Sequence, residues 1–416
     1  ADYHDSDEAL NQMHRYIHEQ QYSDIFSTLQ ILVAMTPHDI KYMARTTDEA
    51  FNKTFAFQWQ RKKDNSPVYD WQEFTASMLS IPMAHQMATN YIILDGTPKR
   101  QMIKVMRPYQ VYAASSIIDK VRQHNFDIDP QGIGYVWHAT GSGKTISSFK
   151  TAWLASRLPN VDKVVFLVDR VALTNQTVDE YSAYDPEKAE NGSGGVVTDA
   201  SNRWVLSRKI RAKGNGIIVT SLQKMAALVK DKQDISNIAK KHILFIVDEA
   251  HRSTSGDMLQ SIKTAFPKSA WVGYTGTPVF DGHSTTREIF GDLIHAYTIV
   301  DAIRDNNVLG FKVDFETTLS DKILKEQYLP AYFKARYPKY TDKQIQDRIN
   351  NLKPEDMDDM IEPSVYDNNQ KHVELVVKDV LKNWDKRSRN GEYNALFTTH
   401  VGGMKPSTPM AMMFYR

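Results

Sequence analysis

The chain has 416 residues, of which 41% are hydrophobic and 24% charged, and its formal net charge is +1. This composition excludes a fibrous or disordered protein, and the near-neutral charge excludes a polycation that binds nucleic acid along its whole length. Cysteine is absent, which excludes disulfide scaffolds, cysteine nucleophiles and cysteine-bound zinc. No apolar run approaches the roughly 18 residues of a membrane helix, so we expect no membrane partner.

The length corresponds to two or three domains at about 150 residues each. The chain starts at Ala1 without a signal-peptide pattern, and it ends in an apolar stretch that lacks a helix cap. We therefore expect an internal piece of a longer cytoplasmic polypeptide.

In chain order, the first predicted element is a helix over residues 8–17, because Leu10, Met13 and Ile17 recur at helical spacing. Residues 1–95 mix helical and strand-like patterns and are rich in aromatic side chains. Turn-forming and basic residues at 96–100 predict a domain boundary.

Beyond that boundary, short apolar runs alternate with helical stretches. The runs occupy 133–137, 164–168, 217–219, 243–247 and 271–273. Continuous apolar runs suit strands buried on both faces, so we predict a parallel sheet with helices on each side. Near the end, a helix over 373–384 and a strand at 395–397 predict that a second α/β domain has begun.

The strongest chemical signal is the loop Thr140-Gly141-Ser142-Gly143-Lys144-Thr145. It joins the run at 133–137 to a helical pattern, and its glycines let backbone N–H groups point at phosphate oxygens beside a helix N-terminus. Lys144 would reach the β- and γ-phosphates of ATP, and the Thr145 hydroxyl would bind Mg²⁺. His138 stands where this motif usually has its first glycine. A glycine-rich turn without ligand is the alternative, which the Lys-Thr pair disfavours.

A second signal, Asp248 with Glu249, directly follows the run at 243–247. Carboxylates at the C-terminal end of a buried parallel strand lie at the ligand-binding edge of such a sheet. Asp248 is placed to hold Mg²⁺ through water, and Glu249 to orient and deprotonate the attacking water. Two acidic residues that cap the next helix are the alternative, which is weak beside a phosphate-binding loop.

These two motifs together resemble those of superfamily-2 helicases and translocases, and further motifs follow in that family's order. The resemblance implies an adenine-reading element with Arg107 and Gln110. It implies strand-end loops that grip the nucleic-acid backbone, with the residues Arg170, Thr220 and Gln223. It also implies coupling of hydrolysis to DNA movement by His251, Thr275, Gly276 and Thr277. Taken singly, these segments read as helix starts and ordinary turns.

Several segments narrow the resemblance to the restriction (motor) subunit of type I restriction–modification enzymes. They lie at 137–145, 168–170, 248–253, 274–278 and 301–309. His138 is a feature of that family. The resemblance implies ATP and Mg²⁺ as ligands, double-stranded DNA as the track, and methylation and specificity subunits as partners.

That family carries a nuclease before the motor, followed by a Gln-x-x-x-Tyr helix. Gln12 and Tyr16 resemble that helix, and Lys53 loosely matches a nuclease-side lysine that approaches the motor. A polar helix face with a packed tyrosine is the alternative for Gln12 and Tyr16. The metal-binding residues of the nuclease are expected upstream of Ala1.

Three basic clusters, at 61–63, 99–100 and 203–213, could contact phosphates. Surface charge for solubility is the favoured interpretation of the first two. The third lies between two motor motifs and is a candidate DNA contact.

We therefore predict an α/β protein with a RecA-like motor domain at 96–298. The C-terminal part of a nuclease-like domain would precede it at 1–95, and the N-terminal part of a second RecA-like domain would follow at 299–416. The predicted function is ATP-dependent translocation along double-stranded DNA, followed by endonuclease cleavage, in a type I restriction complex. The alternatives are a nuclease-free superfamily-2 helicase or remodeller, and an ATP-gated DNA-binding scaffold without turnover.

In families of this kind, an arginine of the second motor domain completes the transition-state charge. We expect its motif beyond Arg416. The isolated chain is therefore expected to bind ATP with Mg²⁺ but to hydrolyse ATP poorly.

Overall fold

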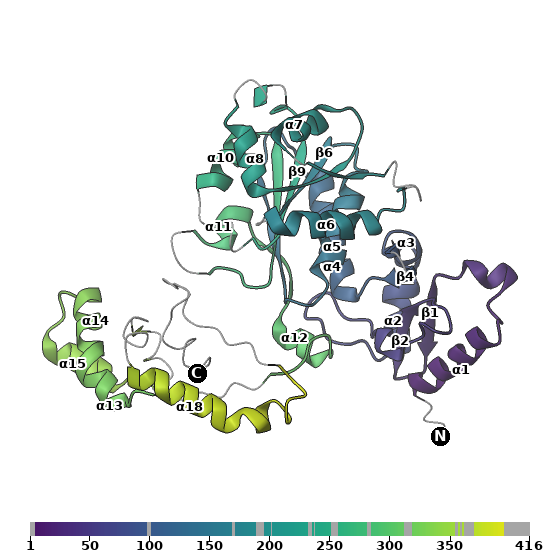
Figure 1. The fold of residues 1–416 in the computed structure, drawn as a ribbon. Coiled ribbons are helices and arrows are strands. Elements are labelled where there is room, and N and C mark those ends of the chain that lie inside the picture. Colours follow the sequence, from purple (N-terminus) through teal and green to yellow (C-terminus); the bar gives the residue numbers. More distant parts are fainter. Residues whose placement is uncertain are drawn as a thin grey trace. The chain divides into compact units, whose positions relative to one another are not determined.

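The computed structural model describes most of the chain between residues 5 and 394. The described ranges are 5–97, 101–168, 171–188, 195–200, 202–231, 235–236, 238–250, 257–280, 284–311, 318–353, 357, 360–361 and 370–394. The chain divides into two compact units, Ala1–Gly310 and Phe311–Arg416, each described by itself. Figure 1 shows the ribbon with its elements labelled. Within the described ranges, no helix has both the length and the apolar character needed to cross a membrane.

A seven-stranded sheet lies at the centre of the first unit, in the order β11-β5-β10-β9-β6-β8-β7. Figure 1 labels two of its strands, β6 and β9. All its neighbouring strands pair in parallel. The strands are β5 (Gly132–His138), β6 (Lys163–Val168), β7 (Val197–Asp199), β8 (Ile217–Ser221), β9 (Ile243–Val247), β10 (Ser269–Thr275) and β11 (Leu293–Tyr297). The α/β class and the parallel sheet are therefore confirmed, and each predicted apolar run is one of these strands.

Helices cover both faces of this sheet because successive residues of each strand enter opposite cores. Val164 and Phe166 of β6 lie in one core, and Val165 and Leu167 lie in the other. The helices of the first core are α4 (Pro108–Gln123), α5 (Lys144–Ala155) and α6 (Val171–Ala183). The helices of the second are α7 (Arg203–Arg211), α8 (Leu222–Val229), α10 (Asp257–Ala265) and α11 (Thr286–Phe290).

A smaller mixed region precedes the sheet. Its helices and helical turns are α1 (Ser6–His18), η1 (Asp24–Thr28), η2 (Lys53–Phe55), α2 (Trp71–Phe74), η3 (Thr75–Leu79) and α3 (Met83–Thr89). Two antiparallel pairs complete it: β1 (Ile31–Met35) with β2 (Ile40–Ala44), and β3 (Ile92–Asp95) with β4 (Met102–Val105). The predicted helix over 8–17 is confirmed as part of α1.

The mixed region shares a core with the first helix of the sheet domain. Tyr42 and Trp59 are fully buried, and their rings contact each other edge to face at 5.9 Å between centroids. Tyr112 of α4 packs on Trp59 at 5.5 Å. The β3–β4 pair spans the segment at 96–100 where the sequence predicts a boundary, so the polypeptide on both sides of that segment belongs to one compact unit.

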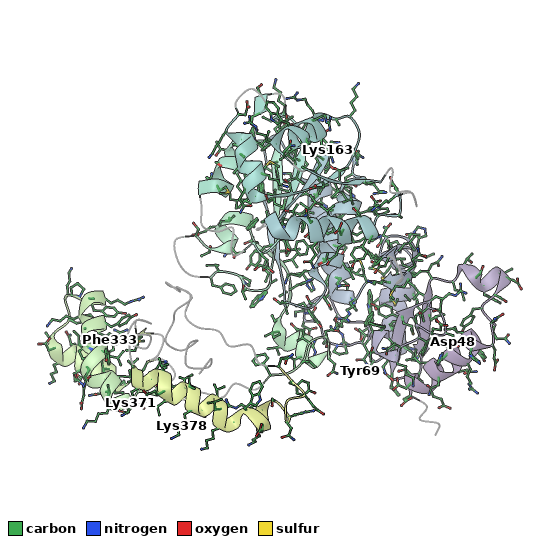
Figure 2. The ribbon with its side chains drawn as sticks, viewed as in Figure 1. Asp48, Tyr69, Lys163, Phe333, Lys371 and Lys378 are labelled. Atoms are coloured by element: carbon green, nitrogen blue, oxygen red, sulfur yellow. The ribbon has the colours of Figure 1, made fainter. Side chains whose placement is uncertain are left out.

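The second unit is helical in its described part. Its elements are α13 (Asp321–Ile323), η5 (Leu324–Tyr328), α14 (Leu329–Arg336), α15 (Asp342–Asn350) and α18 (Gln370–Arg387). Phe333 lies in a small core between α14 and α15, and Lys371 and Lys378 are exposed on α18 (Figure 2). The predicted helix over 373–384 is confirmed by α18. The predicted strand at 395–397 lies outside the described residues.

Candidate nucleotide-binding site

The loop between β5 and α5 has the backbone that the sequence predicts. Gly141 and Gly143 adopt left-handed φ angles of 84° and 81°, which side chains disfavour. A Cβ atom at Gly143 would lie 2.7 Å from Nε2 of Gln110. Ser142 is almost fully buried, and its hydroxyl donates to the carbonyl of Ala139 at 2.6 Å. The result is a tight loop that ends directly at the N-terminus of α5.

Lys144 and Thr145 begin α5, and both side chains are partly exposed. Nζ of Lys144 lies 3.5 Å from the carbonyl oxygen of His138. The positive charge of Lys144 also acts to lower the pKa of Asp248, which brings the phosphate-binding loop and the end of β9 into one electrostatic site.

Asp248 and Glu249 form the turn after β9. Burial, and then the adjacent charge of Glu249, raise the pKa of the Asp248 carboxyl to about 6. Glu249 has a left-handed φ of 48°, a conformation that costs a non-glycine residue roughly 1–2 kcal/mol. The turn is held by Ala250, whose N–H donates to the carbonyl of Tyr274 at 3.0 Å. Two adjacent carboxylates in a strained, partly buried turn form a site that a cation would stabilise.

The end of β10 reaches the same loop. The indole N–H of Trp137 donates to the carbonyl of Gly276 at 3.0 Å, and Thr277 N–H donates to the Thr275 hydroxyl at 3.1 Å. A Cβ atom at Gly276 would lie 2.9 Å from Oγ1 of Thr140. The structure therefore brings Thr275, Gly276 and Thr277 beside the phosphate-binding loop.

The side chain of Gln110 in α4 forms hydrogen bonds with the backbone of this loop. Its Oε1 accepts from Arg107 N–H at 3.0 Å, while Nε2 donates to the carbonyls of Ser142 and Gly143 at 3.1 and 3.2 Å. The guanidinium of Arg107 lies over the Phe57 ring at 4.6 Å. Both ends of the Gln110 amide are thus bonded to the chain itself, so base reading by this side chain, which stays a prediction, requires it to exchange partners.

A cluster of aromatic and histidine side chains packs next to the loop, and the sequence analysis did not predict it. The rings of Tyr109 and Tyr297 stack at 3.6 Å, and the Tyr109 hydroxyl donates to the Ser142 carbonyl at 2.6 Å. His138 is fully buried, and its Nε2 lies 3.2 Å from Nδ1 of His295. Burial lowers the pKa of His138 well below its usual value and that of His295 to about 4, so both rings are neutral at pH 7. His138 stands where the loop motif usually has a glycine, and this is the sequence feature that could have pointed to the cluster.

The SWI2/SNF2 ATPase family model matches residues 109–346, more than half of the chain. The chain belongs to the SWI2/SNF2 ATPase family. This membership implies the use of ATP, and the matched region begins at Tyr109 and includes the loop, the Asp248–Glu249 turn and the end of β10.

Curated relatives of this SWI2/SNF2 ATPase extend the similarity to the mixed region. The endonuclease subunit of a type I restriction enzyme from Staphylococcus aureus (strain COL) is 34% identical over 95% of the chain. A type I restriction enzyme endonuclease subunit from Staphylococcus saprophyticus is 32% identical over 99%. The chain spans 38% and 39% of the lengths of these two relatives.

Solved structures with similar folds include the ATP-dependent Type ISP restriction-modification enzyme LlaBIII bound to DNA. That similarity covers 72% of this chain and 20% of LlaBIII, at 15% identity and a TM-score of 0.40. The UvsW helicase from bacteriophage T4 matches 50% of this chain and 65% of its own, at 16% identity and a TM-score of 0.33.

The residues predicted to contact DNA differ in their exposure in this SWI2/SNF2 ATPase. Thr220 is fully buried, and its hydroxyl has no hydrogen-bond partner among the described residues. Gln223 is exposed on the first turn of α8. Arg170 and His251 lie outside the described residues. Contact with DNA by Thr220, Gln223 and Arg170, and coupling by His251, stay predictions.

The predicted nuclease-associated residues lie in the mixed region of the ATPase. The Gln12 side chain donates to the Tyr16 hydroxyl at 2.5 Å on an exposed face of α1. Lys53 is partly exposed on η2, close enough to Asp7 to help lower the pKa of that carboxyl, although the ion pair of Asp7 with Lys41 is the larger cause.

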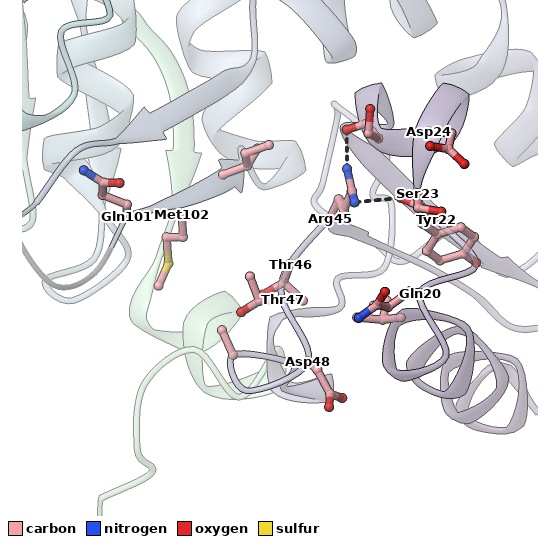
Figure 3. A pocket seen from close by; sticks show the side chains of 14 residues that line it. Gln20, Tyr22, Ser23, Asp24, Arg45, Thr46, Thr47, Asp48, Gln101 and Met102 are labelled. Carbon is pink, nitrogen blue, oxygen red and sulfur yellow. Dashed lines mark hydrogen bonds between the residues drawn. The ribbon is translucent and has the colours of Figure 1, made fainter.

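A separate hollow of about 730 Å³ opens beside the end of α1, and Figure 3 shows the side chains that line it. Tyr22 and Asp48 lie on its wall, as does Met102 of β4. Arg45, also on the wall, donates to the carbonyls of Tyr22 and Ser27. The residues of the phosphate-binding loop do not line this hollow, so it is not the nucleotide site.

Proposed function

We propose that this chain is the ATP-dependent motor portion of the endonuclease subunit of a type I restriction enzyme. It would translocate double-stranded DNA before cleavage, together with methylation and specificity subunits. The observation that carries the proposal is the convergence of the 140–145 loop, the Asp248–Glu249 turn and the end of β10 at one edge of a parallel sheet. The similarity to restriction endonuclease subunits over 95% of the chain supports the choice of system.

ATP would bind with its phosphates at the loop. The left-handed glycines leave room for the backbone N–H groups to face phosphate oxygens, and the N-terminus of α5 adds its positive dipole end. Lys144 would neutralise charge on the β- and γ-phosphates. Because these donors are fixed by the fold before the nucleotide arrives, they stabilise the charge that develops during hydrolysis without reorganisation.

The acidic turn fits a bound Mg²⁺. The raised pKa of Asp248 reflects a partly buried, desolvated carboxylate beside a second carboxylate, and a divalent cation would relieve this unfavourable interaction. Asp248, through water, and the Thr145 hydroxyl would hold the ion, which would supply charge neutralisation at the phosphates when bound. Glu249 would orient the attacking water and accept its proton.

Coupling to DNA would run through the end of β10 and the following turns. Gly276 lies against Thr140, and the Thr277 N–H is bonded to the Thr275 hydroxyl on either side of it, so a change at the phosphate-binding loop can displace this turn through Gly276. Arg170, Thr220, Gln223 and His251 are the further residues that we assign to DNA binding and coupling. We also retain the division into a nuclease-like part at 1–95, a motor domain at 96–298 and the beginning of a second motor domain at 299–416.

The proposal is tested by cleavage of plasmid DNA by the complete subunit, reconstituted with its methylation and specificity partners. Cutting that requires ATP in the unmodified complex and is lost in Lys144→Ala is the expected result. ATP consumption and strand separation of a forked duplex, without any cutting, would instead support the nuclease-free helicase.

A further inference from the structure

Residues 57–68 of the mixed region contact the sheet domain close to the nucleotide site. Gln60, which is 5% exposed, donates from Nε2 to Oδ2 of Asp305 at 2.5 Å. Its carbonyl accepts from the Tyr112 hydroxyl of α4 at 2.5 Å. Asn65 donates to the carbonyl of Ala296 in β11 at 2.8 Å. The segment is therefore fixed to α4, to β11 and to the residues that follow α12 (Ile299–Arg304).

Asp305 connects Gln60 to Tyr297, which lies closer to the phosphate-binding loop. Its Oδ2 also accepts from the Tyr297 hydroxyl at 2.9 Å, and Arg304 holds its other oxygen at 2.9 Å. Tyr297 is fully buried, and its ring stacks on Tyr109 at 3.6 Å. Tyr109 in turn donates to the carbonyl of Ser142. Four successive contacts thus lead from Gln60 to the backbone of the phosphate-binding loop.

Residues 297–308, which include Tyr297 and Asp305, also contact the loop directly. The N–H of Ala139 donates to the Tyr297 carbonyl at 2.8 Å, and Asn307 donates to the Tyr297 hydroxyl. A Cβ atom at Gly141 would lie 3.2 Å from a methyl group of Val308. These contacts hold the loop on the side of β11.

The bond from Tyr109 has a consequence for ligand binding. A trans peptide is planar, with its C=O and N–H pointing in opposite directions. Because Tyr109 and Gln110 hold the Ser142 carbonyl toward α4, the N–H of Gly143 in the same peptide faces away from α4. That is the direction a phosphate-binding donor requires.

We infer that Tyr297 and Asp305 are positioning residues of the nucleotide site, and that Gln60 ties the N-terminal mixed region to them, so that binding of ATP and packing of residues 57–68 are coupled. The inference rests on the proposed use of the 140–145 loop for ATP. Linkage makes the coupling reciprocal: ATP stabilises the packed segment by the same factor by which the packed segment improves ATP affinity. Coupling free energies of this kind typically correspond to about a 5-fold change in affinity or more.

The test measures the Kd for ATP with Mg²⁺, and amide hydrogen exchange of residues 57–68 with and without ATP, on the 416-residue chain. Tyr297→Phe removes the hydroxyl and keeps the stacked ring, and Gln60→Glu sets a carboxylate against Asp305. Gln58→Glu is the matched control, because Gln58 in the same segment faces Asp39 instead, at 3.4 Å. Gln60→Glu combined with Asp305→Asn exchanges the carboxylate and the amide and restores the hydrogen bond between positions 60 and 305, but the amide nitrogen that then faces position 60 cannot accept from the Tyr297 hydroxyl as Oδ2 does.

In the unmodified chain, ATP is expected to slow exchange in 57–68. Tyr297→Phe and Gln60→Glu are expected to weaken ATP binding about 5-fold or more and to abolish that slowing, while Gln58→Glu behaves as the unmodified chain and the exchanged pair recovers part of the affinity lost in Gln60→Glu. Equal ATP affinity in Gln60→Glu, Tyr297→Phe and Gln58→Glu, with exchange that ignores ATP, would overturn the inference and leave the nucleotide site standing. Failure of the unmodified chain to bind ATP would instead overturn the proposed function.

Discussion

Short sequence motifs point to both the phosphate-binding loop and helix α1, but the two motifs differ in how many other elements of the fold contact them. In α1, Gln12 and Tyr16 lie on an exposed face and bond to each other, so the helix alone satisfies the motif. Around the loop, side chains of α4 bond to Ser142 and Gly143, Tyr297 of β11 stacks on one of those side chains, and Gly276 after β10 lies against Thr140. A motif that needs several elements to complete it carries more functional information than one that a single helix turn can satisfy.

Their carboxylates differ in the same sense. Asp48, beside α1, is partly exposed, and the hydrogen bond from His18 lowers the pKa of its carboxyl. Asp248 is also partly exposed, but desolvation and the adjacent charge of Glu249 raise the pKa of its carboxyl. The first carboxylate is already paired and solvated, whereas the second stores an unfavourable interaction that ligand binding can release.

The largest effect is expected for Glu249→Gln. Removing the group that we assign as general base is expected to lower DNA-stimulated ATP turnover of the complete complex about 10³-fold, while ATP binding persists. Steady-state turnover and equilibrium nucleotide binding, compared between variant and unmodified complexes, check this. Unchanged function without the base would favour the ATP-gated scaffold.

Lys144→Ala is expected to reduce both turnover and affinity, with turnover falling about 10²-fold because a fixed positive charge at the phosphates is lost. Lys150→Ala is the control, since this lysine lies on the same helix and packs over the Trp153 ring rather than at the loop. A turnover loss of equal size in both variants would assign the effect to α5 as a whole.

Gly143→Ala is expected to lower the free energy of unfolding by about 2 kcal/mol, since it combines left-handed strain with the loss of Gln110 hydrogen bonds. Gly214→Ala isolates the strain, because Gly214 has a similar φ of 83° and no atom within 4 Å of the added Cβ. Urea unfolding of both variants gives the difference, expected at about 1 kcal/mol in favour of Gly214→Ala. ATP affinity should fall only in Gly143→Ala.

Stability is expected to fall as the pH drops below about 6.5, in part because of the buried histidine pair. In the native state burial keeps His138 and His295 neutral, with the pKa of His295 at about 4, whereas the unfolded chain binds protons near pH 6.5. The unfolded state then holds more protons between about pH 6.5 and pH 4, so each group removes up to about 1.4 kcal/mol per pH unit. Urea unfolding at several pH values, beside His295→Gln, measures the slope. A variant with the unmodified slope would contradict the assignment.

The smallest effect is expected for Gln12→Ala. Because Gln12 is exposed and bonds only within α1 among the described contacts, its replacement should change the free energy of unfolding by less than about 0.5 kcal/mol and leave ATP affinity unchanged. A large loss of ATP affinity would erase the contrast between α1 and the loop.

The sheet and much of the site could be predicted because short, local sequence patterns specify them. Continuous apolar residues mark β6 and β9, and the glycines with Lys144 mark the loop. Edge strand β11 escaped prediction because His295 interrupts its apolar residues, and its partner β5 is far away in the chain. The stacking of Tyr109 on Tyr297 could not be predicted for the same reason, since neither residue has a local signal for the other.

Gln110 shows a different limit. Its sequence context fits both a base-reading side chain and the third residue of a helix that begins at Pro108. In the structure its Oε1 accepts from the Arg107 N–H at the start of that helix and its Nε2 bonds to the loop, while base reading stays a prediction. Local patterns name the residue types at a site, and only the packed structure decides which of their hydrogen bonds are already used.

Under the proposed function, the site at this sheet edge drives movement along double-stranded DNA. The most direct test is displacement of a triplex-forming oligonucleotide, placed downstream of the recognition sequence, by the complete restriction complex. We expect ATP-dependent displacement by the unmodified complex and none by the Glu249→Gln complex bound to the same DNA. Displacement by the Glu249→Gln complex at the unmodified rate would contradict it.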